Sequence, residues 1–145
     1  MVRGTDGDGD SSQTDADVGG EAGAVVRRYL DRLVAHDWEA MAACLADDVV
    51  RVGPFGDTYT PRDVYVAFLS ALMPSLPGYS MRIDRVVSSG PTVVVELTEV
   101  IDMGGSPFET PEALVFDLDP GGLIAHITIY IQRLGDVPAV PATAR

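Results

Sequence analysis

The residues best suited to proton transfer lie on two apolar segments in the second half of the chain. Asp102 ends the segment TVVVELTEVID, in which Glu96, Thr98 and Val100 have the same parity as Asp102. Residues of one parity share a face of a β-strand. If that face lines an apolar hollow, the loss of hydration raises the pKa of a carboxyl group until the group exchanges protons near neutral pH. We therefore expect Glu96, Thr98 and Val100 to line a substrate pocket, with Asp102 as its proton-transfer residue.

The second segment, GLIAHITIYIQR, alternates between two sets of side chains, as a strand does. His126, Thr128 and Tyr130 have one parity, and Ile127, Ile129 and Ile131 have the other. Imidazole titrates near pH 7, so His126 is a suitable catalytic partner for Asp102 on a neighbouring strand. We expect the polar set to face the pocket, with Thr128 and Tyr130 as lining. Two alternatives stay open: Asp102 could bond backbone amides in the MGGSP turn, and His126 could be a structural histidine of the sheet.

The elements that must position these residues follow from hydrophobic periodicity. An amphipathic helix with Tyr29 on its apolar stripe is expected from Glu21, and a short second helix follows Asp37, a suitable N-cap. A strand, DDVVRVG, precedes a third helix that starts at TPRD, buries Val64, Phe68, Ala71 and Leu72, and ends at Pro74. Four strands of period two then follow at about 80–88, 92–102, 108–118 and 122–132, and short connections make them an antiparallel meander. This is an α+β layout, in which three helices cover one face of a strongly bent sheet.

Charge and composition exclude several classes of partner. With 22 acidic and 10 basic residues, the net charge of -12 repels phosphate backbones and acidic lipid surfaces, so we expect neither nucleic acid nor a membrane as partner. The sequence contains no run of eighteen apolar residues and no signal-peptide core, which favours a cytoplasmic protein. Residues 1–18 are expected to form a disordered acidic tail, residues 19–134 a single domain, and residues 135–145 a flexible tail.

The stretch AVVRRYLDRLVAHDWEAMAACLADDVVRVGPFG at 24–56, together with this element order, resembles the nuclear transport factor 2-like superfamily. The resemblance is strongest to its ketosteroid isomerase-like and SnoaL-like polyketide cyclase branches, and it covers roughly residues 21–134. It implies a cone-shaped fold whose curved antiparallel sheet and three helices enclose a deep apolar pocket. We expect Phe68, Leu114 and Phe116 to line that pocket. The family often forms homodimers through the outer sheet face, where we expect the isoleucine row to be buried, either in a dimer or under neighbouring elements.

The ketosteroid isomerase pattern is only partly present. The tyrosine that stabilises an oxyanion in those enzymes matches Tyr29. Their catalytic base matches Gly53, and their protonated aspartate matches Leu114 or Ala113. Steroid isomerisation by the family mechanism is therefore not expected.

Two other branches are also matched in part. Limonene-epoxide hydrolase-like members resemble the chain at LTEVID, where Asp102 is kept, Val100 replaces an arginine, and Thr128 replaces a second aspartate. SnoaL-like cyclases resemble it at GLIAH, where His126 is kept and Thr128 replaces an aspartate. The chain thus has the family's pocket without a complete catalytic set from any branch.

The sequence contains none of the phosphate-loop, dinucleotide-binding or nucleophile-elbow motifs, and its two histidines lack metal-ligand spacing. We therefore expect no metal and no cofactor. The function expected is that of a cofactor-free acid–base isomerase, cyclase or dehydratase acting on a hydrophobic small molecule, with Asp102, Tyr29 and His126 as catalytic residues. The alternative is a non-catalytic module of the same fold that binds a small molecule or dimerises. Epoxide hydrolysis is less well supported. Glu112 could project into the mouth of the pocket or into solvent, and we expect it to face solvent.

Overall fold

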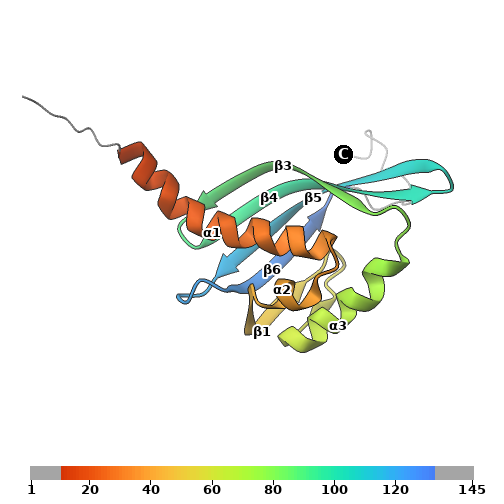
Figure 1. Ribbon diagram of the computed structural model, residues 1–145, viewed down its shortest axis with the longest axis horizontal. Helices are drawn as coiled ribbons and strands as arrows, with labels where there is room; N and C mark the ends of the chain where they lie inside the picture. The colour runs from red at the N-terminus through yellow and green to blue at the C-terminus, as the bar shows by residue number, and fades with distance from the viewer. Residues whose placement is uncertain (1–10, 133–145) are drawn as a thin grey trace, which may run out of the picture.

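Six strands form one curved mixed sheet, and the helices lie on one side of it (Figure 1). The computed structural model describes residues 11–132, with side chains from Gly20 onward. The helices are α1 (Ser11–Val34), α2 (Trp38–Ala42), α3 (Arg62–Leu72) and the 3-10 turn η1 (Met73–Ser75). The strands are β1 (Leu45–Val52), β2 (Thr58–Tyr59), β3 (Ser80–Ser89), β4 (Thr92–Met103), β5 (Ser106–Leu118) and β6 (Ile124–Ile131). Residues 1–10 and 133–145, which include most of the expected tails, lie outside the described part of the chain.

The predicted meander is confirmed, since β3, β4, β5 and β6 are successive antiparallel neighbours close to the expected bounds. The sheet as a whole is mixed, however, because β1 joins it parallel to β6, with Arg51 opposite Ile127. A hairpin fixes strand direction locally, but β1 and β6 are far apart in the sequence and no local signal sets how they pair. The complete order is β2-β1-β6-β5-β4-β3.

The α1 stripe is confirmed, with Val26, Tyr29 and Leu30 fully buried. The helix begins at Ser11 and not at Glu21. Asp37 caps α2 as expected, accepting a hydrogen bond from the backbone N–H of Ala40.

The buried face predicted for α3 is wrong in register. Tyr65 and Leu69 face the core, while the expected Val64 is 48% exposed. The helix begins at Arg62 after Pro61, with no side-chain cap from Thr60. Phe68 is half-buried, and its ring stacks on that of Tyr59 with centroids 3.9 Å apart.

The predicted orientation of β4 and β6 is wrong. The core beneath α1 is made by the odd residues Val93, Val95 and Leu97, with Phe116 from β5 and Ile127 from β6. Ile127 is thus buried within the chain, and Ile129 and Ile131 are half-buried on the same face. The even residues of β4, and those of β6 from His126 onward, form the outer face of the sheet. Each strand turns the parity with more apolar side chains toward the helices.

Among the described residues, no helix is long and apolar enough to span a membrane. The cytoplasmic location expected from the sequence stays a prediction.

Candidate active site on the concave face of the sheet

The predicted proton-transfer residue Asp102 lies at the exposed end of β4. Its Oδ1 accepts a hydrogen bond of 2.7 Å from the backbone N–H of Gly105, and its own N–H donates to the carbonyl of Pro77 at 2.7 Å. The carboxylate therefore closes the β4–β5 turn, which was the structural alternative. A catalytic role for Asp102 stays a prediction that its position does not support.

The other even-numbered residues expected in the pocket on β4 and β6 also lie on the outer face. His126 is half-buried there, with its Nδ1 3.3 Å from Thr128 Oγ1. Glu96 pairs with Arg85 at 2.6 Å, and Tyr130 is 60% exposed. Thr98 is buried beneath Arg82 and Asp84, and Val100 shares its face. None of these residues lies on the same side of the sheet as Tyr29. Asp102 and His126 do not form the expected catalytic pair.

The concave face carries a different set of polar side chains, which includes Tyr29 of α1. Of the expected pocket residues, Leu114 and Phe116 lie on this face, and Phe116 makes an edge-on contact with Tyr29 at 5.7 Å between ring centroids. The hydroxyl of Tyr29 forms a buried hydrogen bond with that of Tyr65, which comes from α3. Burial raises the pKa of both phenols, so both carry their protons at neutral pH.

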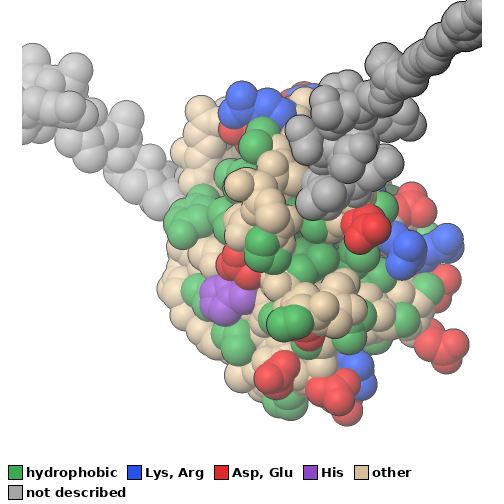
Figure 2. Space-filling model, turned by 90° about the vertical axis from the view of Figure 1, so that its left-hand side faces the viewer, with side chains coloured by type: hydrophobic (Ala, Val, Ile, Leu, Met, Phe, Trp, Pro, Cys, Tyr) green, Lys and Arg blue, Asp and Glu red, His purple; other side chains and the backbone are tan. Residues whose placement is uncertain are grey.

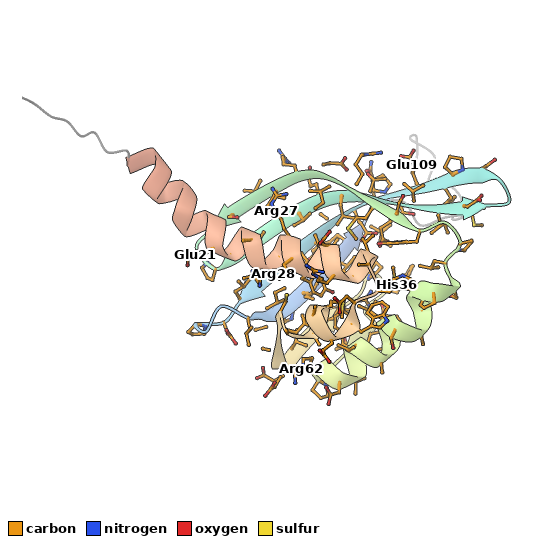
Figure 3. All side chains as sticks on the ribbon, in the orientation of Figure 1. Glu21, Arg27, Arg28, His36, Arg62 and Glu109 are labelled. Atoms are coloured by element: carbon orange, nitrogen blue, oxygen red, sulfur yellow. The ribbon has the colours of Figure 1, made fainter. Side chains whose placement is uncertain are left out.

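Arg51 of β1 places a positive charge beside the tyrosine pair. The residue is 9% exposed, and its Nη1 lies 2.9 Å from Asp57 Oδ2. Its guanidinium carbon lies 5.6 Å from the ring centroid of Tyr59, 5.9 Å from that of Tyr65 and 5.5 Å from that of Phe68. These cation–π distances and the ion pair together stabilise a charge that would be costly to bury alone. Arg27 and Arg28 lie on α1, and Arg62, at the start of α3, pairs with Asp47 at 2.8 Å (Figure 3).

Gly53 is the position matched to the base of ketosteroid isomerases. A Cβ at this position would meet both oxygens of the Asp57 carboxylate and would lie 2.6 Å from Arg51 Nη1. The carboxylate of Asp57 thus fills the space next to Gly53, and the absence of a side chain there allows the Arg51–Asp57 pair to form.

Two glutamates complete the set at the other end of the concave face. Glu99 accepts a hydrogen bond from the hydroxyl of Tyr79. Glu112 lies opposite Leu97, and Glu99 lies opposite Thr110, so the two carboxyl groups occupy diagonal positions on one face of β4 and β5. Burial, and then the neighbouring Glu99, raise the pKa of Glu112 to about 9, while Arg51 opposes this shift. Glu112 is therefore protonated at neutral pH, and it is half-buried at the edge of the concave face and does not project freely into solvent as expected.

A hollow of about 410 Å³ adjoins Glu112. Glu112, Leu97 and Ile131 are among its lining residues, as are Glu96 and Tyr130 from the outer face. Glu112 therefore contributes both to this hollow and to the polar set on the concave face.

Sequence reasoning missed Arg51, Tyr65, Glu99 and Glu112. A signal existed, because Glu99 continues the parity of the apolar Val93, Val95 and Leu97, and Arg51 interrupts an apolar strand. A charged residue on the apolar parity of a strand is rarely left without a partner or a function.

The chain belongs to the SnoaL-like domain family, whose model matches residues 26–127. A search among curated proteins finds no significant match. Three solved structures illustrate the shared fold. A candidate ketosteroid isomerase from Kribbella flavida is 23% identical with a TM-score of 0.68, over 86% of this chain and 87% of its own. A candidate SnoaL-like polyketide cyclase from Shewanella denitrificans is 16% identical with a TM-score of 0.69, over 77% and 90%. An LEH-like epoxide hydrolase from M. tuberculosis is 24% identical with a TM-score of 0.69, over 79% and 84%. The nuclear transport factor 2-like fold expected from the sequence is thereby confirmed.

Replacement of Gly53 by alanine tests the tight packing around the ion pair. Because the new methyl group displaces Asp57 from Arg51, we expect Gly53→Ala to lower the free energy of unfolding by roughly 1–3 kcal/mol in urea denaturation. In an Asp57→Ala background, the same substitution should cost clearly less, since the displaced carboxylate is gone. Gly20→Ala is the matched control: nothing lies within 4 Å of that position on α1, and alanine there should stabilise the helix slightly. If Gly53→Ala lowered the free energy of unfolding equally in both backgrounds, displacement of Asp57 would not be the cause.

The raised pKa of Glu112 makes stability depend on pH. The unfolded chain releases this proton above the ordinary pKa of 4.5, but the folded protein keeps it up to about pH 9. The folded state thus binds the extra proton between these values, and the free energy of unfolding falls as pH rises through this window. Glu112→Gln should remove this slope. The free energy of unfolding of the variant minus that of wild type should therefore be higher at pH 8 than at pH 5, by on the order of 1–2 kcal/mol. Glu96→Gln, on the exposed outer face, should leave the slope in place; parallel curves for Glu112→Gln and wild type would show that Glu112 is ionised normally.

Proposed function

We propose that the protein is a cofactor-free acid–base enzyme that acts on a hydrophobic small molecule at the concave face of its sheet. The observation that carries this proposal is the pair of carboxyl groups, Glu99 and Glu112, on the same face as the hydroxyls of Tyr29 and Tyr65. A carboxyl group that keeps its proton at neutral pH, next to a second carboxyl group, can supply an acid and a base in a single site. The structural relatives described as isomerase, cyclase and epoxide hydrolase support chemistry of this kind.

The reaction that fits is proton transfer next to a carbonyl group. The Glu99 carboxylate removes a proton from the carbon beside the carbonyl, and the electrons of the broken C–H bond move to the carbonyl oxygen. The tyrosine pair donates a hydrogen bond to the resulting enolate oxygen. Glu112 then donates its proton to another carbon of the same molecule, and Glu99 passes its proton on to Glu112, so an isomer leaves and both carboxyl groups return to their starting states.

Asp102 and His126 have no part in this proposal. The carboxylate of Asp102 is engaged by the backbone N–H of Gly105, and His126 lies on the opposite face from Tyr29. The hydroxyl of Tyr29, which the sequence analysis expects to stabilise an oxyanion, keeps that role here as part of the tyrosine pair.

A non-catalytic binding module is the second candidate. One observation favours it: Tyr29 and Tyr65 are only 1% and 2% exposed, so a small molecule reaches them only if neighbouring side chains move. The two candidates differ in whether proton exchange occurs, which can be measured without knowledge of the natural substrate.

The test is exchange of carbon-bound hydrogen in D2O. Wild-type protein incubated with a panel of apolar cyclic ketones should accelerate deuterium incorporation beside the carbonyl group of at least one, as followed by NMR. Glu99→Gln should lower that rate by about 10²-fold or more, because it removes the base. Glu109→Gln, on the outer face and outside the hollow that Glu112 lines, is the matched control and should retain the wild-type rate. Equal rates for wild type and Glu99→Gln would remove Glu99 from the mechanism, and ketone binding without exchange would favour the binding module.

We further propose that two copies associate through the outer face of the sheet. Val87 and Tyr130 are 51% and 60% exposed there, next to half-buried Val94 and Val115. Arg85 and Glu96 provide charges of both signs on the same face, so the surface is complementary to a second copy of itself. Hydrophobic side chains also reach the surface between charged ones at the end of the molecule seen in Figure 2. The isoleucine row is not part of this face: Ile127, Ile129 and Ile131 lie on the side of the sheet that the helices cover, which was the second of the two expected positions.

Analytical ultracentrifugation tests this association. Wild type should sediment as a dimer, and the double substitution Val87→Ser with Tyr130→Ser should weaken dimerisation by at least about tenfold, since it removes the most exposed apolar side chains of the face. Val64→Ser, which changes an equally exposed apolar residue on α3, should leave the dimer intact. The proposal would be contradicted if wild type were monomeric, or if Val64→Ser weakened dimerisation as much as the double substitution does.

A further inference from the structure

Strand β6 ends where its partner strand can no longer return its hydrogen bonds. The last pair of the β5–β6 ladder is Glu112 opposite Ile131, so Pro111 and Gln132 come next. The N–H of Gln132 donates to the carbonyl of Pro111 at 3.0 Å, but a proline has no N–H with which to complete the pair. The chain bends at Gln132. The C-terminal segment, residues 133–145, starts at this end of the ladder.

This end of the ladder forms part of the wall of the hollow that Glu112 lines. Pro111 and Gln132 are both among the residues around that hollow. Consecutive Cα atoms are about 3.8 Å apart, so the Cα atoms of Arg133 and Leu134 lie within about 8 Å of that of Gln132. Chain connectivity thus keeps the first residues of the C-terminal segment at the hollow.

The lining of the hollow matches these first residues in charge and in polarity. Within the described part of the chain, its charged side chains are all acidic: Asp84 of β3, Glu96 of β4 and Glu112 of β5. Its apolar side chains include Leu97 and Ile131. The C-terminal segment reads RLGDVPAVPATAR and begins with one cationic and one large apolar side chain. An arginine is attracted by the carboxyl groups, and a leucine gains free energy by leaving water for the apolar wall.

A second hollow extends the surface available to the rest of the segment. It has a volume of about 340 Å³, shares Pro111 with the first hollow, and lies along β5 toward Pro107. Val137 and Val140 supply apolar side chains for it, and the prolines at 138 and 141 favour an extended chain. Because the segment is tethered beside both hollows, its effective concentration there is in the millimolar range, and weak contacts suffice to hold it.

We propose that the C-terminal segment binds back over the hollow and covers the outer approach to Glu112, with Arg133 toward the carboxyl groups and Leu134 against Leu97 and Ile131. The chain thereby supplies its own lid, and a ligand that enters by the hollow has to displace it. Coverage of the hollow is independent of the proposed function, because it concerns access and holds whether or not Glu112 takes part in proton transfer.

The test measures how well the segment protects a cysteine placed in the hollow. Ala113, a half-buried lining residue, is replaced by cysteine in the full chain, and its alkylation by the neutral reagent N-ethylmaleimide is followed by mass spectrometry. The native Cys44 is 2% exposed and gives a slow background. Leu134→Ser in this reporter should raise the alkylation rate by at least about threefold, and Arg133→Ala by about twofold, since each removes a contact that holds the segment in place.

Two controls separate uncovering of the hollow from other effects. Arg3→Ala removes one positive charge at the other end of the chain and should leave the rate at the Ala113→Cys reporter unchanged. A second reporter, Val64→Cys on α3, replaces a 48% exposed residue outside the hollow, so its rate should not respond to Leu134→Ser. Circular dichroism melting shows whether each variant is folded.

Three results would overturn the lid. One is an equal alkylation rate in the Ala113→Cys reporter with and without Leu134→Ser and Arg133→Ala. Another is a rate that rises as strongly at Val64→Cys, because the substitution then loosens the whole domain. The third is protection of the Leu134→Ser reporter by an excess of wild-type chains, because the segment then acts on a second copy. None of these results affects the hydrogen exchange that tests the proposed function.

Discussion

A buried positive charge on the concave face of the sheet constrains much of the surrounding structure. Arg51 lies opposite Ile127, in a part of the sheet where an unpaired charge would be strongly destabilising. It is tolerated because Asp57 turns back toward it, and Gly53 has no side chain to prevent this. The backbone of the turn agrees, since the N–H of Gly53 donates to the carbonyl of Asp57 at 2.7 Å. Burial of the Arg51 guanidinium thus depends on a neighbouring glycine, an aspartate and a pair of stacked aromatic rings.

The concave face changes character along its strands. On β4, Val93, Val95 and Leu97 lie beneath α1, and Glu99 follows on the same parity. On β5, Phe116 and Leu114 are followed toward the N-terminal end of the strand by Glu112. The two strands therefore present an apolar region and then a pair of carboxyl groups. Such a surface would orient a small molecule with an apolar body and one reactive polar end.

Membership of the SnoaL-like family explains the shape of the molecule but not its chemistry. Tyr29 is kept at a position where relatives use a tyrosine, but Gly53 leaves the matched position of the base empty. The acids found on the concave face, Glu99 and Glu112, come instead from the middle of the meander. A fold of this kind holds side chains from several strands around one surface, so a catalytic pair can be supplied from different positions.

The local elements were largely predictable. The four long strands, the α1 stripe and the Asp37 cap each depend on neighbouring residues, so alternation and turn residues placed them close to their observed bounds. The face of each strand was not predictable in the same way. Both parities of β4 carry apolar and acidic residues, and family-matched Asp102 favoured the wrong one.

By itself, the sequence determined which segments are strands and helices, because side-chain periodicity acts over a few residues. Only the tertiary structure decided which side of the sheet is covered, because that depends on where α1 packs. It also decided that Arg51 meets Tyr65 and that Glu99 adjoins Glu112. These contacts join residues from α3 and from β1, β4 and β5, and strand pairing and helix packing over long chain separations bring them together.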